Sequence, residues 1–367
     1  MQFLGEGNNS KKGKLQTGRS IVVLGNHPND GFSMQRYTRL IEAAYKDLGF
    51  RVQVAVPPRI LSRYLNPGKI RKFAVYVESF ILFPVALLQF LWSNSSFHIS
   101  DHSNSIWSLI PWIRNAKITC HDLFAVRAAL GEIPEYRPKL LGKLYQYLVL
   151  VGLQSAELII CVSKSTESDV LRIVKSAVTV VVYNPLDPNI TKVSRTRSRR
   201  TYGQYLLIVG SSGWRKNRAK ALSVWADLRF AIDKDIELVV VGPNLSADEM
   251  ELIPDSLLSS VHQLQNVEDG QLSLLYSESL GLILTSKYEG FGWPVAECNA
   301  HARLVVCSDI PVLREIGPGN IFLHENSSNN WTEVYEKLLS DDQRRAVKGF
   351  ASKYNWGNYL EGFRKIL

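Results

Sequence analysis

The chain has 367 residues, a hydrophobic content of 46% and only four cysteines. This length favours two domains over one. The few cysteines, with no C-x-x-C pair, exclude a disulfide scaffold and argue against structural zinc. The whole net charge of +9 lies in residues 1–190, where 22 Lys and Arg face 13 Asp and Glu. Such an excess is typical of a protein that meets an anionic membrane surface, a phosphate-bearing ligand or nucleic acid, and equally of a merely soluble basic surface.

Short β-branched runs alternate with amphipathic stretches of helical length, a pattern typical of parallel sheets covered by helices. No apolar stretch of the signal-peptide type precedes Ile21, so we expect a cytoplasmic protein. Helices are predicted at Met34–Leu48, which ends before Gly49, and at Lys164–Ile173, which follows the capping residue Ser163. The predicted strands of this half are Ile21–Leu24, Val52–Val56, Phe97–Ile99, Lys117–Thr119, Leu158–Cys161 and Val178–Val182.

The most apolar window runs from Phe73 to Trp92 and is about long enough to span a bilayer. It contains Glu78, Pro84 and Gln89, which favour a buried or interfacial helix over a membrane span. The preceding stretch, residues 59–73, interleaves five cations with apolar residues, a composition that suits contact with anionic lipid.

A polar, basic segment, TKVSRTRSRRTYG, follows Ile190 and is typical of an interdomain linker. We therefore predict an N-terminal domain over 1–190 and a C-terminal domain over 191–354. Ligands in open α/β sheets bind at the carboxyl ends of the strands. The predicted strands of the second half are Tyr205–Val209, Glu237–Val241, Gly281–Leu284, Leu304–Cys307 and Ile321–Leu323.

The segment EGFGWPVAE, residues 289–297, follows a predicted strand and leads into a helix with Pro294 in its first turn. Gly290 and Gly292 allow close approach of a ligand, and N–H groups at a helix start suit a phosphate. Glu289 and Glu297 have carboxylates that can accept hydrogen bonds from sugar hydroxyls. Alternatively, the glycines form a tight turn, and the two glutamates are solvated or capping residues.

Three other places carry candidate residues. Arg215 and Lys216 are adjacent cations on a loop after a strand and suit a leaving group that gains negative charge. His121 lies at a strand's carboxyl end, where a neutral imidazole can hydrogen-bond a sugar hydroxyl. A second polar group, at residues 98–102, contains His98, Asp101 and His102; it lacks metal-ligand spacing and fits either acceptor contact or plain loop polarity.

The E-x7-E segment resembles the signature of retaining GT-B glycosyltransferases, particularly glycosyltransferase family 4 of group 1 type. The resemblance runs along nearly the whole chain, through segments that appear in the family's order: residues 25–34, 120–123, 162–169, 183–187, 209–217, 286–288, 307–315 and 354–356. It implies two Rossmann-like doubly wound domains that face each other across a cleft. It also implies that the last helix, 355–367, completes the N-terminal domain.

The resemblance implies roles for individual residues. Glu297 would bind the donor ribose. Glu289, with the amides of Gly290, Phe291, Gly292 and Trp293, would face the donor sugar, as would His121. Arg215 and Lys216 would hold the diphosphate.

Two positions depart from the family's pattern. Gly210 is followed by Ser211 where many relatives have Arg, which would place more of the diphosphate contact on Arg215 and Lys216. The first loop has the lone Gly31 where many relatives have two glycines; this loop approaches donor and acceptor in the family.

The implied activity is that of a metal-independent, retaining hexosyltransferase without a cofactor. It would move a sugar from a nucleotide-diphosphate sugar to a glycan or lipid-linked acceptor in cell-surface polysaccharide biosynthesis, in the cytoplasm or peripherally on the inner face of the cytoplasmic membrane. A soluble acceptor is an alternative, as is a noncatalytic sugar-nucleotide or glycan-binding protein. A glycoside hydrolase has candidate carboxylates by residue type only, and the chain lacks the aromatic-basic motifs of nucleic-acid-binding modules.

Overall fold

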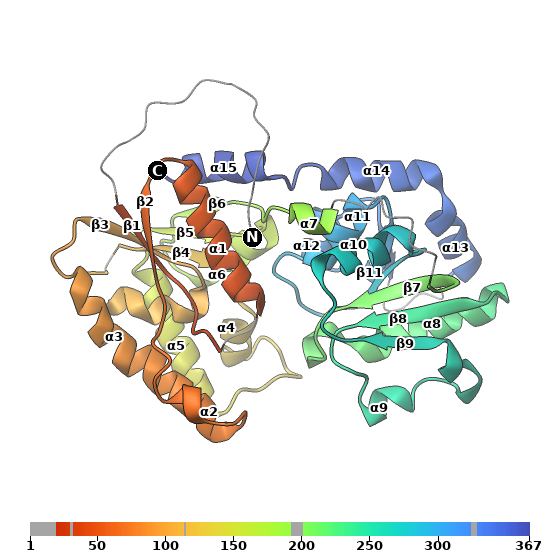
Figure 1. Cartoon of the computed structure of the whole chain (residues 1–367), viewed down its shortest axis with the longest axis horizontal. Helices are drawn as coiled ribbons and strands as arrows, with labels where there is room; N and C mark the ends of the chain where they lie inside the picture. Colours follow the sequence, from red (N-terminus) through yellow and green to blue (C-terminus); the bar gives the residue numbers. More distant parts are fainter. Residues whose placement is uncertain (1–19, 30–31, 114, 192–200, 324–328) are drawn as a thin grey trace. The chain divides into compact units, whose positions relative to one another are not determined.

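The computed structural model describes residues 20–29, 32–113, 115–191, 201–323 and 329–367. They form two compact units (Figure 1). The first contains the described residues up to Thr119, together with Leu144–Ile159 and Phe363–Leu367. The second contains Cys120–Lys143 and the described residues of Ile160–Gly362. The predicted linker lies largely outside the described residues, because 192–200 are not among them.

The first sheet has six strands in the order β2-β1-β3-β4-β5-β6. β1 pairs in parallel with both β2 and β3, so the strand order reverses between β1 and β3. In doubly wound sheets such a reversal is where ligands bind. The strands are β1 (Ser20–Leu24), β2 (Arg51–Ala55), β3 (Ser95–Ile99), β4 (Lys117–Cys120), β5 (Leu158–Cys161) and β6 (Thr179–Val181).

The second sheet has the order β12-β11-β10-β7-β8-β9, and its reversal lies between β7 and β10, which pair in parallel. Read from the β9 edge, this is the strand order of dinucleotide-binding folds. The strands are β7 (Gln204–Val209), β8 (Ile236–Val241), β9 (Val261–Leu264), β10 (Gly281–Leu284), β11 (Leu304–Ser308) and β12 (Ile321–Leu323).

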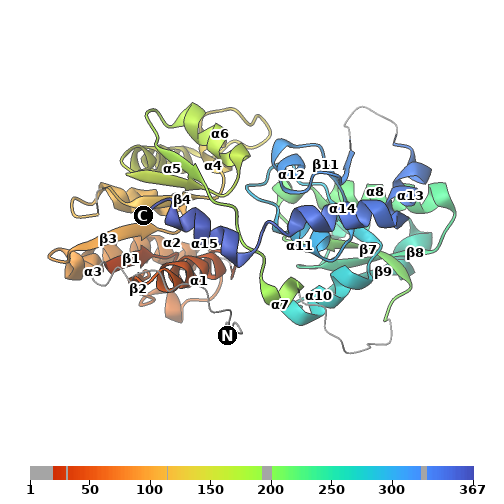
Figure 2. The ribbon, with the colours of Figure 1, turned by 90° about the horizontal axis from the view of Figure 1, so that it is seen from above.

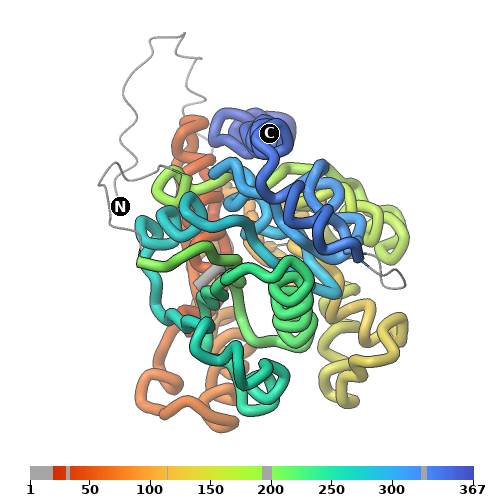
Figure 3. Tube along the Cα trace, turned by 90° about the vertical axis from the view of Figure 1, so that its right-hand side faces the viewer, coloured from red at the N-terminus to blue at the C-terminus, as the bar shows by residue number. Residues whose placement is uncertain are grey.

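Helices cover the sheets, and their apolar faces form the cores. In the second unit, α14 packs on α11 (Figure 2), and α8, the green coil in Figure 3, buries Trp225 against the sheet. The helices are α1 (Phe32–Asp47), α2 (Lys69–Val77), α3 (Phe83–Ala86), α4 (Phe124–Ala129), α5 (Leu140–Gln154), α6 (Lys164–Ile173), α7 (Pro188–Thr191), α8 (Arg218–Ile232), α9 (Ala247–Met250), α10 (Asp269–Glu278), α11 (Trp293–Ala300), α12 (Pro311–Ile316), α13 (Trp331–Leu339), α14 (Asp341–Ala351) and α15 (Trp356–Arg364).

All eleven predicted strands are present, within one or two residues of their predicted bounds at most ends. The helix predicted at 164–173 is α6, and the Ser163 hydroxyl accepts a hydrogen bond from the Thr166 N–H at 3.1 Å, as a capping residue does. One strand, β9, was not predicted. Its side chains are mostly half-buried, so the strand lacks the continuous apolar run that marks a buried parallel strand.

The apolar window predicted as a buried or interfacial helix forms one helical run, Lys69–Phe90, the orange rod of α2 and α3 in Figure 1. By length and composition alone it could cross a membrane, and 33% of its most apolar window is buried. One side packs on the first unit. Phe83 contacts Trp107 edge to face, with ring centroids 4.8 Å apart, and the Trp107 indole N–H donates to the Ser79 carbonyl at 3.0 Å.

Candidate functional site

The site lies at the reversal point of the second sheet, where the loops after β7 and β10 meet. Gly210 follows β7 with a φ of +139°, a conformation that L side chains rarely adopt. A short 3-10 turn, Trp214–Lys216, then carries the two predicted cations. The Lys287 N–H, on the loop after β10, donates to the Arg215 carbonyl at 2.8 Å. This backbone bond holds the two loops together.

Lys216 and Glu289 form an ion pair, with Nζ and Oε1 2.6 Å apart. Their side chains are only 16% and 8% exposed. The Ser286 hydroxyl donates to the same carboxylate oxygen at 2.7 Å, so Glu289 is held from two directions. The structure thus brings together a predicted catalytic cation and a predicted catalytic carboxylate that are 73 residues apart in sequence.

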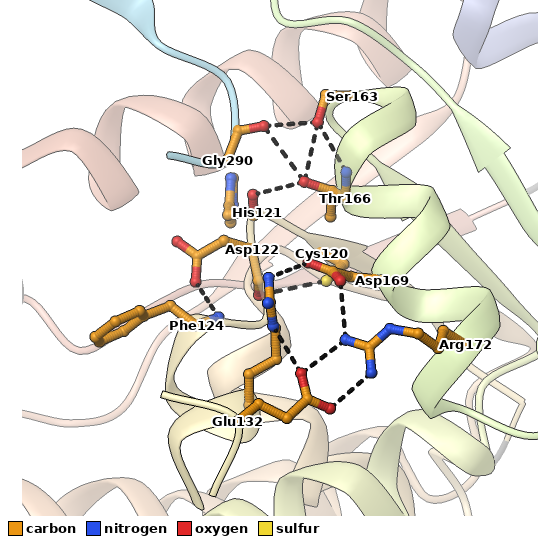
Figure 4. A network of polar contacts seen from close by, with 11 residues as sticks. Cys120, His121, Asp122, Phe124, Glu132, Ser163, Thr166, Asp169, Arg172 and Gly290 are labelled. Atoms are coloured by element: carbon orange, nitrogen blue, oxygen red, sulfur yellow. Dashed lines mark hydrogen bonds and ion pairs between the residues drawn. The ribbon is translucent and has the colours of Figure 1, made fainter. Parts of the chain in front are cut away.

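Gly290 sits against the backbone of His121. A Cβ at this position would lie 1.8 Å from the His121 carbonyl oxygen, so only glycine fits. Figure 4 shows Ser163, the capping residue of α6, and Thr166 of that helix directed at the Gly290 carbonyl, to which their hydroxyls donate at 2.7 and 3.3 Å. Gly290 therefore allows two backbone segments of the second unit to pack closely together, in addition to any close approach to a ligand. His121 follows β4 and is half-buried; contact of its imidazole with the donor sugar stays a prediction.

Arg215 is paired with a residue that the sequence analysis did not single out. Its guanidinium donates to Asp122 Oδ2 at 2.8 Å, and Asp122 Oδ1 accepts from the Phe124 N–H at 3.0 Å. Asp122 directly follows the predicted His121, at the carboxyl end of β4. A rule that searches strand ends for acidic side chains could have found it.

Four aromatic side chains form a cluster that reaches this ion pair through Phe124: Phe124, Tyr136, Trp214 and Tyr288, with ring centroids 5.1 to 6.4 Å apart. The Arg215 guanidinium lies 5.9 Å from the centroid of the Phe124 ring. Aromatic faces attract cations, so Phe124 helps to orient Arg215. None of the four was predicted as a site residue, because aromatic residues scattered along a sequence give no signal by themselves.

Helix α11 begins with the residues predicted to bind the donor. Gly292 is its N-terminal capping residue, with a φ of +85°, and Trp293 and Pro294 form its first turn. Phe291 is buried against Tyr354, with ring centroids 5.3 Å apart. The Phe291 ring therefore anchors the loop, and its backbone amide, not its side chain, is the group that a ligand could contact.

Glu297 lies one turn into α11 and is 4% exposed. Its Oε2 accepts a hydrogen bond from the Tyr276 hydroxyl of α10 at 3.1 Å, and Tyr276 stacks on His301. Tyr276 is thus another residue that the sequence analysis did not find. A hydroxyl that holds one carboxylate oxygen orients the other, and ribose binding by Glu297 stays a prediction.

Two further expectations have different outcomes. Gly31 lies outside the described residues. Of the polar group at residues 98–102, His98 lies in β3, is fully buried and is hydrogen-bonded to Tyr45 and Thr119 at 3.0 and 2.9 Å, so this residue fits neither acceptor contact nor loop polarity. Within the described part of the chain, no three His, Cys, Asp or Glu side chains form a group that could hold a metal ion.

The chain is similar in sequence to known glycosyltransferases. The chain matches the family model Glycosyltransferase Family 4 over residues 34–190 and the model Glycosyl transferases group 1 over residues 191–353. It is 24% identical over 264 residues to the O-antigen chain mannosyltransferase B of Escherichia coli, covering 67% of this chain and 68% of the relative. It is 29% identical over 144 residues to the serotype-specific mannosyltransferase WbdA of Escherichia coli, covering 36% of this chain and 17% of that protein.

Solved structures share the fold at low sequence identity. The sucrose-phosphate synthase of Thermosynechococcus elongatus superposes with a TM-score of 0.72 at 15% identity, over 95% of this chain and 98% of the other. A UDP-forming α,α-trehalose-phosphate synthase from Burkholderia xenovorans superposes with a TM-score of 0.68 at 14% identity, over the same shares of the two chains. With two six-stranded parallel sheets and these neighbours, the fold is GT-B, with two Rossmann-like domains. The chain belongs to the group 1, family 4 type of glycosyltransferases.

Proposed function

We propose that this glycosyltransferase moves a hexosyl residue, with retention of anomeric configuration, from a nucleotide-diphosphate sugar to a glycan or lipid-linked acceptor in cell-surface polysaccharide synthesis. The Lys216–Glu289 ion pair at the reversal point of the second sheet carries the proposal. The names of the two Escherichia coli relatives support mannose as the sugar and a surface polysaccharide as the product.

The proposed mechanism needs no protein nucleophile. The bond between the anomeric carbon and the diphosphate breaks while the acceptor hydroxyl attacks from the same face, and the departing phosphate takes the hydroxyl proton. The protein then contributes position and charge stabilisation. Lys216 and Arg215 stabilise the negative charge that grows on the diphosphate, and their partners Glu289 and Asp122 hold both cations in place before the donor arrives.

The same cations support a reaction without a metal ion. A metal that bridges a leaving diphosphate supplies positive charge, and an ammonium and a guanidinium can supply it instead. In the α11 segment, the N–H groups that follow Gly290 would face the donor, and Glu297, oriented by Tyr276, would accept hydrogen bonds from the ribose.

A thermal-shift experiment tests the donor site. We expect one of UDP, GDP and ADP, added with EDTA, to raise the melting temperature of the wild-type protein, because a ligand that binds only the native state stabilises it. The shift should be lost in Glu297→Gln, which cannot accept ribose hydroxyls as a carboxylate does. Glu336→Gln, on the exposed face of α13, is the matched control and should keep the full shift.

Retention is tested on the product. With the sugar donor of the stabilising nucleotide, the new glycosidic bond should have the donor's anomeric configuration by NMR. An inverted product would contradict the mechanism. A stabilising nucleotide without any transfer to glycan or lipid-linked acceptors would instead favour a noncatalytic binding protein.

We further propose that the protein acts at the cytoplasmic face of an anionic membrane. The helical run Lys69–Phe90 carries an exposed row, here called the apolar stripe, which consists of Ile70, Phe73, Ile81, Val85 and Leu88 with Trp92 just beyond it. Phe73 and Trp92 are 70% and 92% exposed. Exposed large apolar side chains in a row mark a contact surface, and the cations Arg59, Arg63, Lys69 and Lys72 at its start select anionic headgroups.

Vesicle flotation tests this contact. We expect the protein to float with vesicles of phosphatidylglycerol and phosphatidylcholine, less with phosphatidylcholine alone, and less at high salt. The double variant Phe73→Ser/Trp92→Ser should lower the partition coefficient by about tenfold or more, because two buried aromatic side chains are lost from the bilayer. Phe350→Ser, on exposed α14, serves as the control. Equal flotation of both variants would contradict the role of the apolar stripe.

A further inference from the structure

The start of α6 meets two loops of the second unit (Figure 4). The Ser163 hydroxyl, at the cap of the helix, donates to the Gly290 carbonyl at 2.7 Å. The Thr166 hydroxyl lies 3.3 Å from the same carbonyl oxygen and 3.3 Å from the His121 carbonyl oxygen. Ser163 is fully buried, and Thr166 is 4% exposed. Two hydroxyls that are shielded from water therefore hold the Gly290 carbonyl.

Other bonds fix the start of α6 without the help of Gly290. The Glu315 carboxylate, on α12, accepts from the backbone N–H groups of Lys164 and Ser165 at 2.7 and 3.0 Å, one on each oxygen. Helix α12 follows β11 of the second sheet. The Ser163 hydroxyl also accepts from the Thr166 N–H at 3.1 Å, which closes the first turn. This turn is thus a firm support for the Gly290 carbonyl.

The direction of the Gly290 carbonyl decides the direction of the next N–H group. The peptide bond between Gly290 and Phe291 is trans, and the carbonyl and N–H of a planar trans peptide point to opposite sides. Because the carbonyl points at α6, the Phe291 N–H points away from it. Within the described residues, this N–H donates to no protein acceptor. A backbone N–H group is a strong donor, so this one is available to a ligand.

The loop itself restrains this peptide only in part. The Phe291 ring packs on Tyr354 and fixes the position of one end. The other end is glycine, which has the widest choice of backbone conformations. No side chain can replace it, because a Cβ would lie 1.8 Å from the His121 carbonyl oxygen. The two hydroxyls of α6 supply the restraint on rotation that a side chain at position 290 would otherwise give.

We infer that Ser163 and Thr166 are positioning residues of the transfer reaction. They hold the Gly290 carbonyl toward α6 and thereby direct the Phe291 N–H to a hydroxyl oxygen of the donor sugar. The identity of this ligand rests on the proposed function, in which the N–H groups after Gly290 face the sugar donor. The restraint on the peptide rests only on the contacts of α6.

Isothermal titration of the double variant Ser163→Ala/Thr166→Val tests this role. UDP, GDP and ADP are each compared with their mannose conjugates, in EDTA. We expect the variant to bind the preferred diphosphate within about twofold of wild type, because Glu297 and the two cations, which hold that part, are unchanged. Binding of its mannose conjugate should weaken about tenfold, because one hydrogen bond to the sugar is lost when the peptide rotates.

Three further variants separate positioning from stability. Thr166→Val alone keeps the α6 cap and should weaken binding of the conjugate about threefold, without an effect on the diphosphate. Thr166→Ser keeps the hydroxyl and should bind both ligands as wild type does. Ser340→Ala removes the capping hydroxyl of α14, as Ser163→Ala does for α6, and should leave both affinities unaltered.

The two ligands distinguish the possible results. A loss confined to the mannose conjugate, with wild-type binding by Thr166→Ser and Ser340→Ala, supports the inference. Equal losses for diphosphate and conjugate would overturn it, because they would indicate a general loosening of the second unit. An unchanged affinity for the conjugate in both valine variants would overturn it and leave the proposed function intact. If no conjugate binds wild type, the proposed function fails, and the inference fails with it.

Discussion

Lys216→Met is expected to lower kcat of sugar transfer by about 10²- to 10³-fold, the usual cost of removing one group that stabilises charge in a transition state. Methionine keeps the length of the side chain but removes its charge. The ammonium lies 2.6 Å from Glu289 at the carboxyl end of the second sheet, where the diphosphate would gain charge as the sugar departs. KM for the donor should change much less than kcat, because the interaction strengthens in the transition state.

Steady-state transfer kinetics with a radiolabelled donor measure this effect. Lys220→Met makes the same chemical change on the exposed side of α8 and should leave both constants unaltered. The double variant Lys216→Met/Glu289→Gln should lose little more than the worse single variant, because paired residues act as a unit. A rise in KM with kcat unchanged would assign Lys216 to ground-state binding only.

Glu78→Ala is expected to reduce the free energy of unfolding by about 3–5 kcal/mol, because several buried groups would lose the charged hydrogen-bond acceptor that they share. The Glu78 carboxylate is completely buried. One oxygen accepts from the backbone N–H groups of Ile60, Leu61 and Ser62, and the other lies 2.8 Å from His27 Nε2. Alanine would remove the acceptor that these four groups share.

Urea denaturation at neutral pH measures this loss. Glu42→Ala removes one half of an exposed pair with Lys46 on α1 and should cost less than about 1 kcal/mol, as surface pairs do. A similarly small loss for Glu78→Ala would contradict the structural role of the buried carboxylate.

The same carboxylate gives the first unit an acid dependence. Burial alone would raise the pKa of Glu78, but hydrogen bonds from Ser62, His27 and the Leu61 backbone outweigh it and lower the pKa from 4.5 to about 2. A lowered pKa means that the stabilisation is complete above about pH 4.5 and is lost as the pH falls toward 2, where the folded carboxylate also takes up a proton. The difference corresponds to about 3 kcal/mol. In Glu78→Gln, which cannot titrate, stability should fall less steeply over this range.

Glu78 shows which part of the structure local composition predicts and which part it does not. A single glutamate in an apolar window predicted a buried or interfacial helix. The structure shows why a glutamate is buried there: the N–H groups of residues 60–62 donate to its carboxylate and hold the helix to the preceding segment. Those contacts span 16 to 18 residues and leave no periodic trace in the sequence.

The sequence by itself determined the strands, the cap of α6 and the segment from Glu289 to Glu297, because each depends on burial or backbone conformation within a few residues. β9 was not predicted because its half-buried side chains form no continuous apolar run. Only the tertiary structure decided that Arg215 meets Asp122 and that Gly290 rests on the His121 carbonyl. Such contacts join residues that are distant along the chain, and strand order, which brings them together, follows from the packing of the whole sheet rather than from any local pattern.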